Sequence, residues 1–358
     1  ISEGFAVIID KMMKLPPEKR YQNGKEFLKA IRSCHKLDRR YIVMHRKQTC
    51  IYAAALACVA AGILFISGGL YKVQLEKNSA YYNLIQEAKE AMNVSDFQEA
   101  RENLEGAKEI AQNRIDAYEE EVHLYYLNGS YEECIRVGMN YINTTPFLLE
   151  SEADYELYGN ICYIVGNACY ELEDYSNARM LFEDALKYNQ RNGLYCRDYA
   201  ITLAKLGQTE KAEEQLAEGI RLGIAQDSVY MTQGEIACVK GQYKDAIGYL
   251  NQTIATTKDV QMKKRAILLC ADVYKTMGNE AVEEEINLLN QYKDQFRGTE
   301  NLVILEYLAE AYVRKAQTDE TRANDYYQEA LTLFTTIYEN GFVTYQLQEN
   351  MAIMYENM

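Results

Sequence analysis

The chain has 358 residues, 48% of them apolar, with only 3 Pro and 20 Gly and a formal net charge of −15. This composition excludes a low-complexity disordered chain and suits two ordinary domains or one long repeat array. Residues 1–49 hold 12 Lys or Arg and 5 Asp or Glu, a balance of +7 that leaves −22 on the rest. Because phosphates repel so acidic a chain, no nucleic acid is expected as a partner.

Two short amphipathic helices are predicted within residues 1–36, separated by the break Leu15–Pro16–Pro17. Asn23 is the predicted N-cap of the second helix, with Glu26 three residues further on. The residues expected to face the core are Phe5, Ile8, Ile9, Met12, Phe27, Leu28 and Ile31. Two helices of this length cannot form an independent core, so they belong to a larger unit.

The runs ISEGFAVIIDK and PEKRYQNGKEFLKAI in this segment resemble the end of a bacterial serine/threonine protein kinase domain. The resemblance implies that Arg20 is a structural residue, which in the family pairs with a buried glutamate that this chain lacks. It also implies a parent protein that phosphorylates Ser or Thr with ATP and Mg²⁺. The alternative is a generic helical segment beside a membrane.

The kinase motifs themselves are absent from this sequence: there is no Gly-rich loop, Val-Ala-Ile-Lys lysine, His-Arg-Asp loop or Asp-Phe-Gly motif. This chain alone is therefore not expected to transfer phosphate or to need a cofactor. Since the first residue is Ile rather than Met, we expect the sequence to be a fragment or a processed product.

Residues 50–71 form an uncharged run, CIYAAALACVAAGILFISGGLY, that predicts one transmembrane helix. A buried core helix would carry a polar stripe, and a signal peptide has a shorter apolar run. The linker 37–49 is basic, so residues 1–49 are expected on the cytoplasmic side and the array outside a bacterial cell membrane. Small residues could let two such spans pair as a homodimer: Ala57, Ala61, Gly68 and Gly69.

Residues 81–358 show a repeat whose clearest unit is the 34-residue segment 159–192. Gly166 lies midway along its first helix, where a neighbouring helix must come close, and Asp174–Tyr175 leads into its second helix. The equivalent turn-position residues recur at spacings of 34, 44, 34 and 34 residues: Phe97, Tyr131, Tyr175, Thr209 and Tyr243. Each is followed three residues on by a small residue: Ala100, Cys134, Ala178, Ala212 and Ala246.

This pattern resembles the tetratricopeptide repeat, a helix-turn-helix unit that stacks into a superhelix. Turn glycines close three first helices at Gly129, Gly207 and Gly241. An insertion falls near 146–157, looser repeats follow around Gly278 and Ala323, and 343–358 predicts a last helix. The fold class is therefore all-α, with about seven repeats.

The cysteines and histidines predict no metal site, because no Cys-x-x-Cys pair occurs and His35, His45 and His123 are scattered. Five cysteines are expected to fill the core: Cys134, Cys162, Cys169, Cys196 and Cys270.

The inner face of such an array is its natural groove, and its expected ligand is a protein or peptide. The candidate groove residues are Asn160, Tyr163, Asn167, Tyr170 and Arg197. Asn167 lies where family members often hold a peptide backbone, but no Lys and Arg pair of the carboxylate-clamp subclass appears beside it. An alternative, in which Tyr163 and Tyr170 only pack between helices, stays open.

Two functions fit the sequence. One is the extracytoplasmic sensor of a membrane-bound Ser/Thr kinase, and the other is a non-enzymatic membrane-anchored scaffold or assembly factor. In a third arrangement the span would anchor an array that lies in the cytosol.

Overall fold

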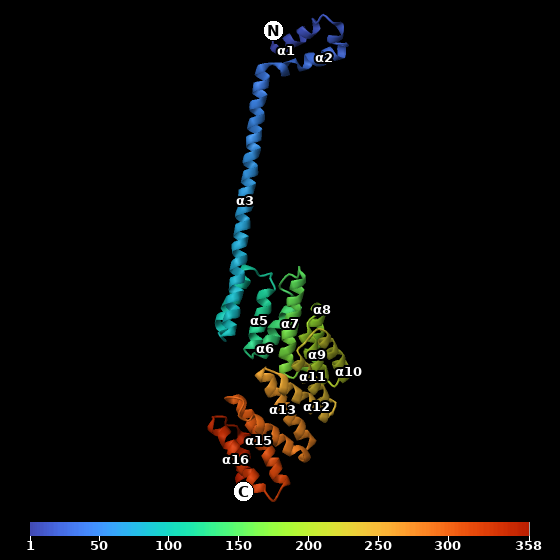
Figure 1. The fold of residues 1–358 in the computed structure, drawn as a ribbon. Helices are drawn as coiled ribbons and strands as arrows, with labels where there is room; N and C mark the ends of the chain where they lie inside the picture. The colour runs from blue at the N-terminus through green and yellow to red at the C-terminus, as the bar shows by residue number, and fades with distance from the viewer. Residues whose placement is uncertain (358) are drawn as a thin grey trace. The chain divides into compact units, whose positions relative to one another are not determined.

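The computed structural model describes residues 1–357, with the side chains of all of them except 299, 300, 346 and 357. Within those residues the regular structure is helical (Figure 1). The chain divides into two compact units, Ile1–Ala80 and Tyr81–Met358, each of which is considered by itself.

Two predicted helices are present in the first unit, α1 (Glu3–Met12) and α2 (Gly24–Ser33). The Asn23 side chain accepts a hydrogen bond from the Glu26 backbone N–H at 2.8 Å, which confirms Asn23 as the N-cap. An ion pair of 2.9 Å between Lys11 and Glu26 joins the two helices. Two short 3₁₀ turns, η1 (Pro17–Lys19) and η2 (Cys34–Leu37), complete this part of the unit.

Only part of the predicted apolar face of α1 and α2 is buried. Ile8 is 2% exposed, whereas Phe5, Met12 and Leu28 are 41%, 46% and 54% exposed. The prediction that Leu28 is buried is therefore wrong, because two ten-residue helices cannot enclose all of each other's apolar side chains. The exposed Arg20 guanidinium donates to the carbonyls of Lys14 and Leu15, at 2.6 and 3.3 Å, and so holds the turn around the prolines.

Helix α3 (Arg39–Asn93) is one uninterrupted helix of 55 residues. It begins inside the segment predicted as a linker and includes the whole of 50–71. Among residues 1–357 it is the helix long and apolar enough to cross a membrane, with a window of mean hydropathy 2.3 of which none is buried. Its residues from Tyr81 onward belong to the second unit.

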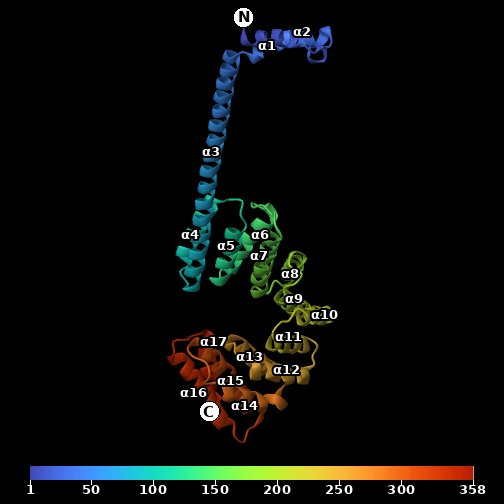
Figure 2. The same cartoon turned by 45° about the horizontal axis from the view of Figure 1, so that its top comes forward.

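The second unit contains seven helix pairs and a last helix in the part of the chain that the structure describes, following one another in chain order (Figures 1 and 2). In each pair the first helix is followed by a short turn and an antiparallel second helix. The pairs are 81–93 of α3 with α4 (Phe97–Ile110), α5 (Asp116–Leu127) with α6 (Tyr131–Thr144), α7 (Glu152–Glu171) with α8 (Tyr175–Tyr188), α9 (Gly193–Lys205) with α10 (Thr209–Arg221), α11 (Gln226–Val239) with α12 (Tyr243–Thr256), α13 (Val260–Met277) with α14 (Val282–Tyr292), preceded by the 3₁₀ turn η3 (Asn279–Ala281), and α15 (Thr299–Thr318) with α16 (Ala323–Glu339); α17 (Tyr345–Asn357) is last. The prediction of about seven repeats and a terminal helix is confirmed.

The predicted register is also confirmed at the turns. The five residues predicted from the repeat spacing are the first residues of α4, α6, α8, α10 and α12. Gly129, Gly207 and Gly241 have φ of +71°, +72° and +70°. Ser95 and Glu173 occupy the same place in their repeats with φ of +62° and +59°, a conformation that favours glycine.

The insertion lies between α6 and α7 and is only partly a loop. Phe147 is 4% exposed, and its ring lies 5.4 Å from that of Tyr118, while the Leu148 N–H donates to the Asn113 carbonyl at 2.9 Å. From Glu152 onward the inserted residues are helical, because Ser151 and Asp154 form a capping box that starts α7 early.

Close helix packing explains the small residues of the repeat. A Cβ added to Gly166 would lie 2.9 Å from Cε1 of Phe182, so only glycine fits there without movement. The five cysteines predicted as core residues are all buried and free, which confirms that prediction. Burial raises the pKa of the Cys134 thiol to about 12, so these thiols are chemically quiet.

The candidate binding groove

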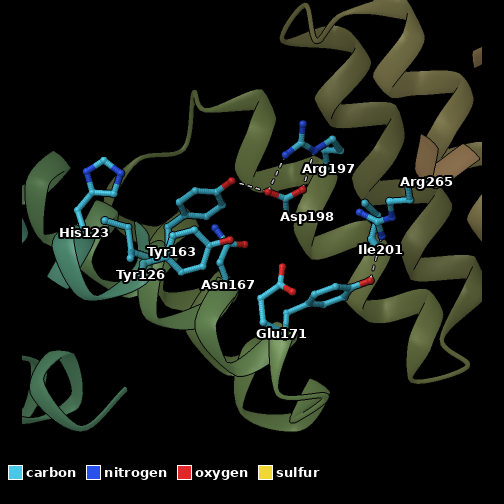
Figure 3. Close-up of a pocket in the computed structure, with 11 residues that line it drawn as sticks. His123, Tyr126, Tyr163, Asn167, Glu171, Arg197, Asp198, Ile201 and Arg265 are labelled. Atoms are coloured by element: carbon cyan, nitrogen blue, oxygen red, sulfur yellow. Dashed lines mark hydrogen bonds and ion pairs between the residues drawn. The ribbon is translucent and has the colours of Figure 1, made fainter. Parts of the chain in front are cut away.

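The first helices of four pairs line a cavity of about 350 Å³ on the inner face of the array (Figure 3). Helices α5, α7, α9 and α13 contribute to it, and every lining residue comes from a first helix. The lining residues are His123, Tyr126, Tyr163, Ile164, Asn167, Tyr170, Glu171, Arg197, Asp198, Ile201 and Arg265.

The array curls strongly enough to bring α13 against α7. Arg265 on α13 donates from Nη2 to the Tyr170 hydroxyl at 3.3 Å, although the two residues are 95 positions apart (Figure 3). A contact between first helices that belong to the third and sixth pairs can form only if the stacked pairs bend around a common inner face. The cavity is therefore a product of the superhelix and not of a single repeat.

Asp198 organises the polar side of the cavity. It accepts two hydrogen bonds from Arg197, at 2.6 and 2.8 Å, and a third from the Tyr163 hydroxyl (Figure 3). Burial and the nearby Asp198 carboxylate raise the pKa of the Tyr163 phenol, so it stays a neutral donor. Burial works against the charge of Arg197, but its bonds to Asp198 outweigh this and raise its pKa. Both side chains are thereby fixed in place.

Next to this cavity, a second hollow of about 290 Å³ contains the buried carboxylate of Glu235 on α11. Burial raises the pKa of Glu235, and the facing charge of Arg265 opposes that rise. The Arg265 Nη2 and Glu235 Oε1 atoms are 2.8 Å apart, and the same pairing raises the pKa of Arg265. Arg265 thus joins the buried acid of α11 to the Tyr170 hydroxyl of α7.

Helix α5 also carries three consecutive buried glutamates, and each has its own partner. Glu120 pairs with Lys89 at 2.6 Å and with His123 at 3.6 Å, whereas Glu121 pairs with Lys108 at 3.0 Å. Glu119 accepts a hydrogen bond from the Asn160 amide at 3.3 Å. Burial, followed by the neighbouring Glu120 charge, raises the pKa of Glu119 to about 7.

Four of the five residues predicted for the groove, Tyr163, Asn167, Tyr170 and Arg197, line this cavity together. Asn160 does not line it, because its side chain is held between the Tyr195 hydroxyl and Glu119. Tyr163 also stacks on Tyr195 with 4.2 Å between ring centroids, so it packs between helices and lines the cavity at once.

Sequence reasoning missed Glu171 on α7 and the residues of other repeats, chiefly Tyr126, Asp198 and Arg265. Arg197 was predicted for the groove, but Arg265 was not; both line the cavity, and each is paired with a carboxylate. Glu171 could have been found, because it lies one turn beyond Asn167 on the same helix face. Arg265 could not, since its approach depends on the curvature of three stacked pairs.

Comparison with known proteins supports the fold. A tetratricopeptide repeat protein from Parabacteroides merdae aligns over 77% of this chain and 99% of its own, with a TM-score of 0.53 and 14% identity. PilW, a type IV pilus biogenesis factor, covers 63% of this chain and 98% of its own, with a TM-score of 0.49 and 18% identity. The alignment with the Parabacteroides merdae protein and the seven helix pairs show that the described chain has the tetratricopeptide-repeat fold, as the sequence predicted.

One curated protein, the BBSome complex member BBS4 of Bos taurus, is 26% identical over an alignment 151 residues long, with a coverage of 35% of this chain. The match spans 29% of the length of that bovine protein. No family model matches the sequence.

Proposed function

We propose that the repeat array is a recognition module that binds an extended segment of a partner protein along the inner face of its first helices. The observation that carries the proposal is the cavity of about 350 Å³, whose walls are aromatic and whose polar groups point inward. Asn167 offers an amide that can donate to and accept from a peptide backbone, and Tyr163 and Arg197 beside it are fixed by Asp198. The proposed role of the cavity is to bind a ligand, not to catalyse a reaction.

The apolar part of α3 supports a second element of the proposal, attachment to a membrane. Its window of mean hydropathy 2.3 is fully exposed, and such a surface is stable only in lipid or against another protein. The basic residues before it and the acidic array after it favour a cytoplasmic N-terminal segment and an extracytoplasmic array. Digestion of intact cells with an added protease would remove the array in this orientation and spare it in the opposite one.

Two wider roles fit a membrane-tethered module of this kind. The resemblance of residues 1–36 to the end of a kinase domain favours the sensor of a bacterial Ser/Thr kinase. The bovine match, which is named as a member of a complex, favours a non-enzymatic scaffold. The gene sequence upstream of Ile1 separates the two, because a kinase would show its lysine-bearing strand and its His-Arg-Asp loop there.

The groove is tested with the full chain in lipid nanodiscs and an array of immobilised random 15-residue peptides. We expect Tyr163→Ala combined with Asn167→Ala to abolish peptide capture while the circular dichroism spectrum keeps its helical amplitude. The matched control is Tyr345→Ala with Asn251→Ala, the same two residue types at exposed sites outside the cavity. Equal peptide capture by the groove variant and the wild type would contradict the groove as the peptide-binding site.

A further inference from the structure

The charged side chains that line the groove cavity are almost completely paired within the protein. Arg197 is bonded to Asp198 at 2.6 Å, Arg265 lies 2.8 Å from Glu235, and His123 faces Glu120 at 3.6 Å. In the part of the chain that the structure describes, Glu171 is the charged residue of this lining without a hydrogen bond or ion pair.

Glu171 is the last residue of α7, one helical turn beyond Asn167. Its side chain lines the cavity beside Asn167 (Figure 3). The residue is exposed to solvent, so its carboxylate is open to a ligand. The cavity therefore carries one uncompensated negative charge.

Aromatic rings surround that charge. Tyr126, Tyr163 and Tyr170 line the same cavity, and Tyr131 lies behind Tyr126 with 5.6 Å between ring centroids. Burial, and after it the nearby Glu171 charge, raises the pKa of Tyr126 to about 12. Ring faces attract cations, and a carboxylate among rings attracts them further.

The walls also suit the stem of a long cationic side chain. Ile164 and Ile201 provide apolar surface in the cavity, along which methylene groups of lysine or arginine can lie. A small hydrated metal ion would gain little here, because a single carboxylate supplies too few oxygen ligands. The balance of −22 on residues 50–358 attracts basic segments from solution.

We propose that the segment bound in the groove presents a lysine or arginine side chain, which enters the cavity between the tyrosines and pairs with Glu171. This inference rests on the proposed function and narrows it to basic peptide ligands. The backbone of the ligand is held at Asn167, and its cationic side chain reaches one turn further along α7.

The test uses the full chain in lipid nanodiscs and the same array of random 15-residue peptides, scored for residue preference. We expect captured peptides to be enriched in Lys or Arg at one position, and matched peptides with norleucine there to bind about 5-fold more weakly. Glu171→Gln removes the preference. Glu173→Gln, which loses the same charge two residues away on a side chain outside the cavity, keeps it.

The possible outcomes separate the inference from the proposal beneath it. Capture without a basic preference, a preference for acidic residues, or a basic preference that survives Glu171→Gln would each overturn the inference and leave the groove in place. Capture of no peptide at all would overturn the groove as well. Loss of the preference in both glutamate variants would mean that the net charge of the protein selects basic peptides. That result would contradict a specific role for Glu171.

Discussion

The apolar stretch of α3 and the first helix α7 are both long helices rich in apolar residues, yet they differ in what covers them. On α7 the polar residues Asn160, Tyr163, Asn167 and Tyr170 follow helical spacing along one face, and the residues between them are buried against neighbouring helices. Residues 50–71 of α3 have no polar face, and the apolar window of the helix is fully exposed. The period of the apolar residues, more than their number, therefore decides whether a helix packs against protein or is left for lipid.

The largest expected effect is on membrane insertion, when charged residues are placed in the proposed span of α3. Leu56→Arg together with Leu64→Arg should cost about 5–7 kcal/mol of insertion free energy, since each central arginine costs about 2.5–3.5 kcal/mol. The measurement is the membrane-bound fraction after a high-pH wash. Leu172→Arg with Met180→Arg, at exposed sites of the array, should leave that fraction unchanged.

The next largest effect is on the free energy of unfolding, when the ion pair of Arg265 is broken. This pair lies where the curved array brings α13 against α7. Arg265→Met should lower the free energy of unfolding by about 3 kcal/mol, because it leaves the Glu235 carboxylate buried without a cation. Arg136→Met, which removes an exposed pair with Glu133, should cost less than about 1 kcal/mol. Equal losses in the two variants, measured by chemical denaturation, would show that the contact across the groove does not stabilise the array.

The raised pKa of Glu119 predicts a pH-dependent stability. The folded state binds this proton more tightly than the unfolded state, so the contribution of Glu119 is present at low pH and is lost as pH rises from about 4.5 through about 7. Glu119→Gln should abolish this decline, whose size is roughly 3 kcal/mol at most. Glu120 raises the pKa of His123, so the contribution of His123 to the free energy of unfolding is lost as pH rises beyond 6.5. The Glu119→Gln variant should therefore keep a smaller decline of stability with pH.

The smallest effect concerns a turn. Glu173→Gly should raise the free energy of unfolding by about 1 kcal/mol, because Glu173 adopts a φ of +59° that glycine reaches without strain. Glu183→Gly, inside α8, should lower it by about 1 kcal/mol. A loss at both positions, measured by thermal unfolding, would mean that the turn is not strained.

The sequence was a good guide wherever a feature depends on neighbouring residues. The starts of the second helices, the turn glycines and the close approach at Gly166 all follow from spacing within one repeat. The contact of Arg265 with Tyr170 depends on the rotations between stacked helix pairs, summed over three pairs. No pattern within a single repeat predicts that sum. Leu28 was misplaced for a related reason, because its burial depends on what surrounds α2 and not on its position along the helix.

The most direct test of the account is a cysteine-accessibility scan along α3 in open membrane fragments, with a membrane-impermeant maleimide. Cys34, Cys50 and Cys58 are first changed to Ser, whereas the array cysteines stay, since they are buried or half-buried and burial raises their thiol pKa. The account predicts an unbroken block of protected positions across residues 50–71, with reactive positions on either side. Protection that instead recurs every three to four residues would show a helix packed against protein and would contradict the membrane span.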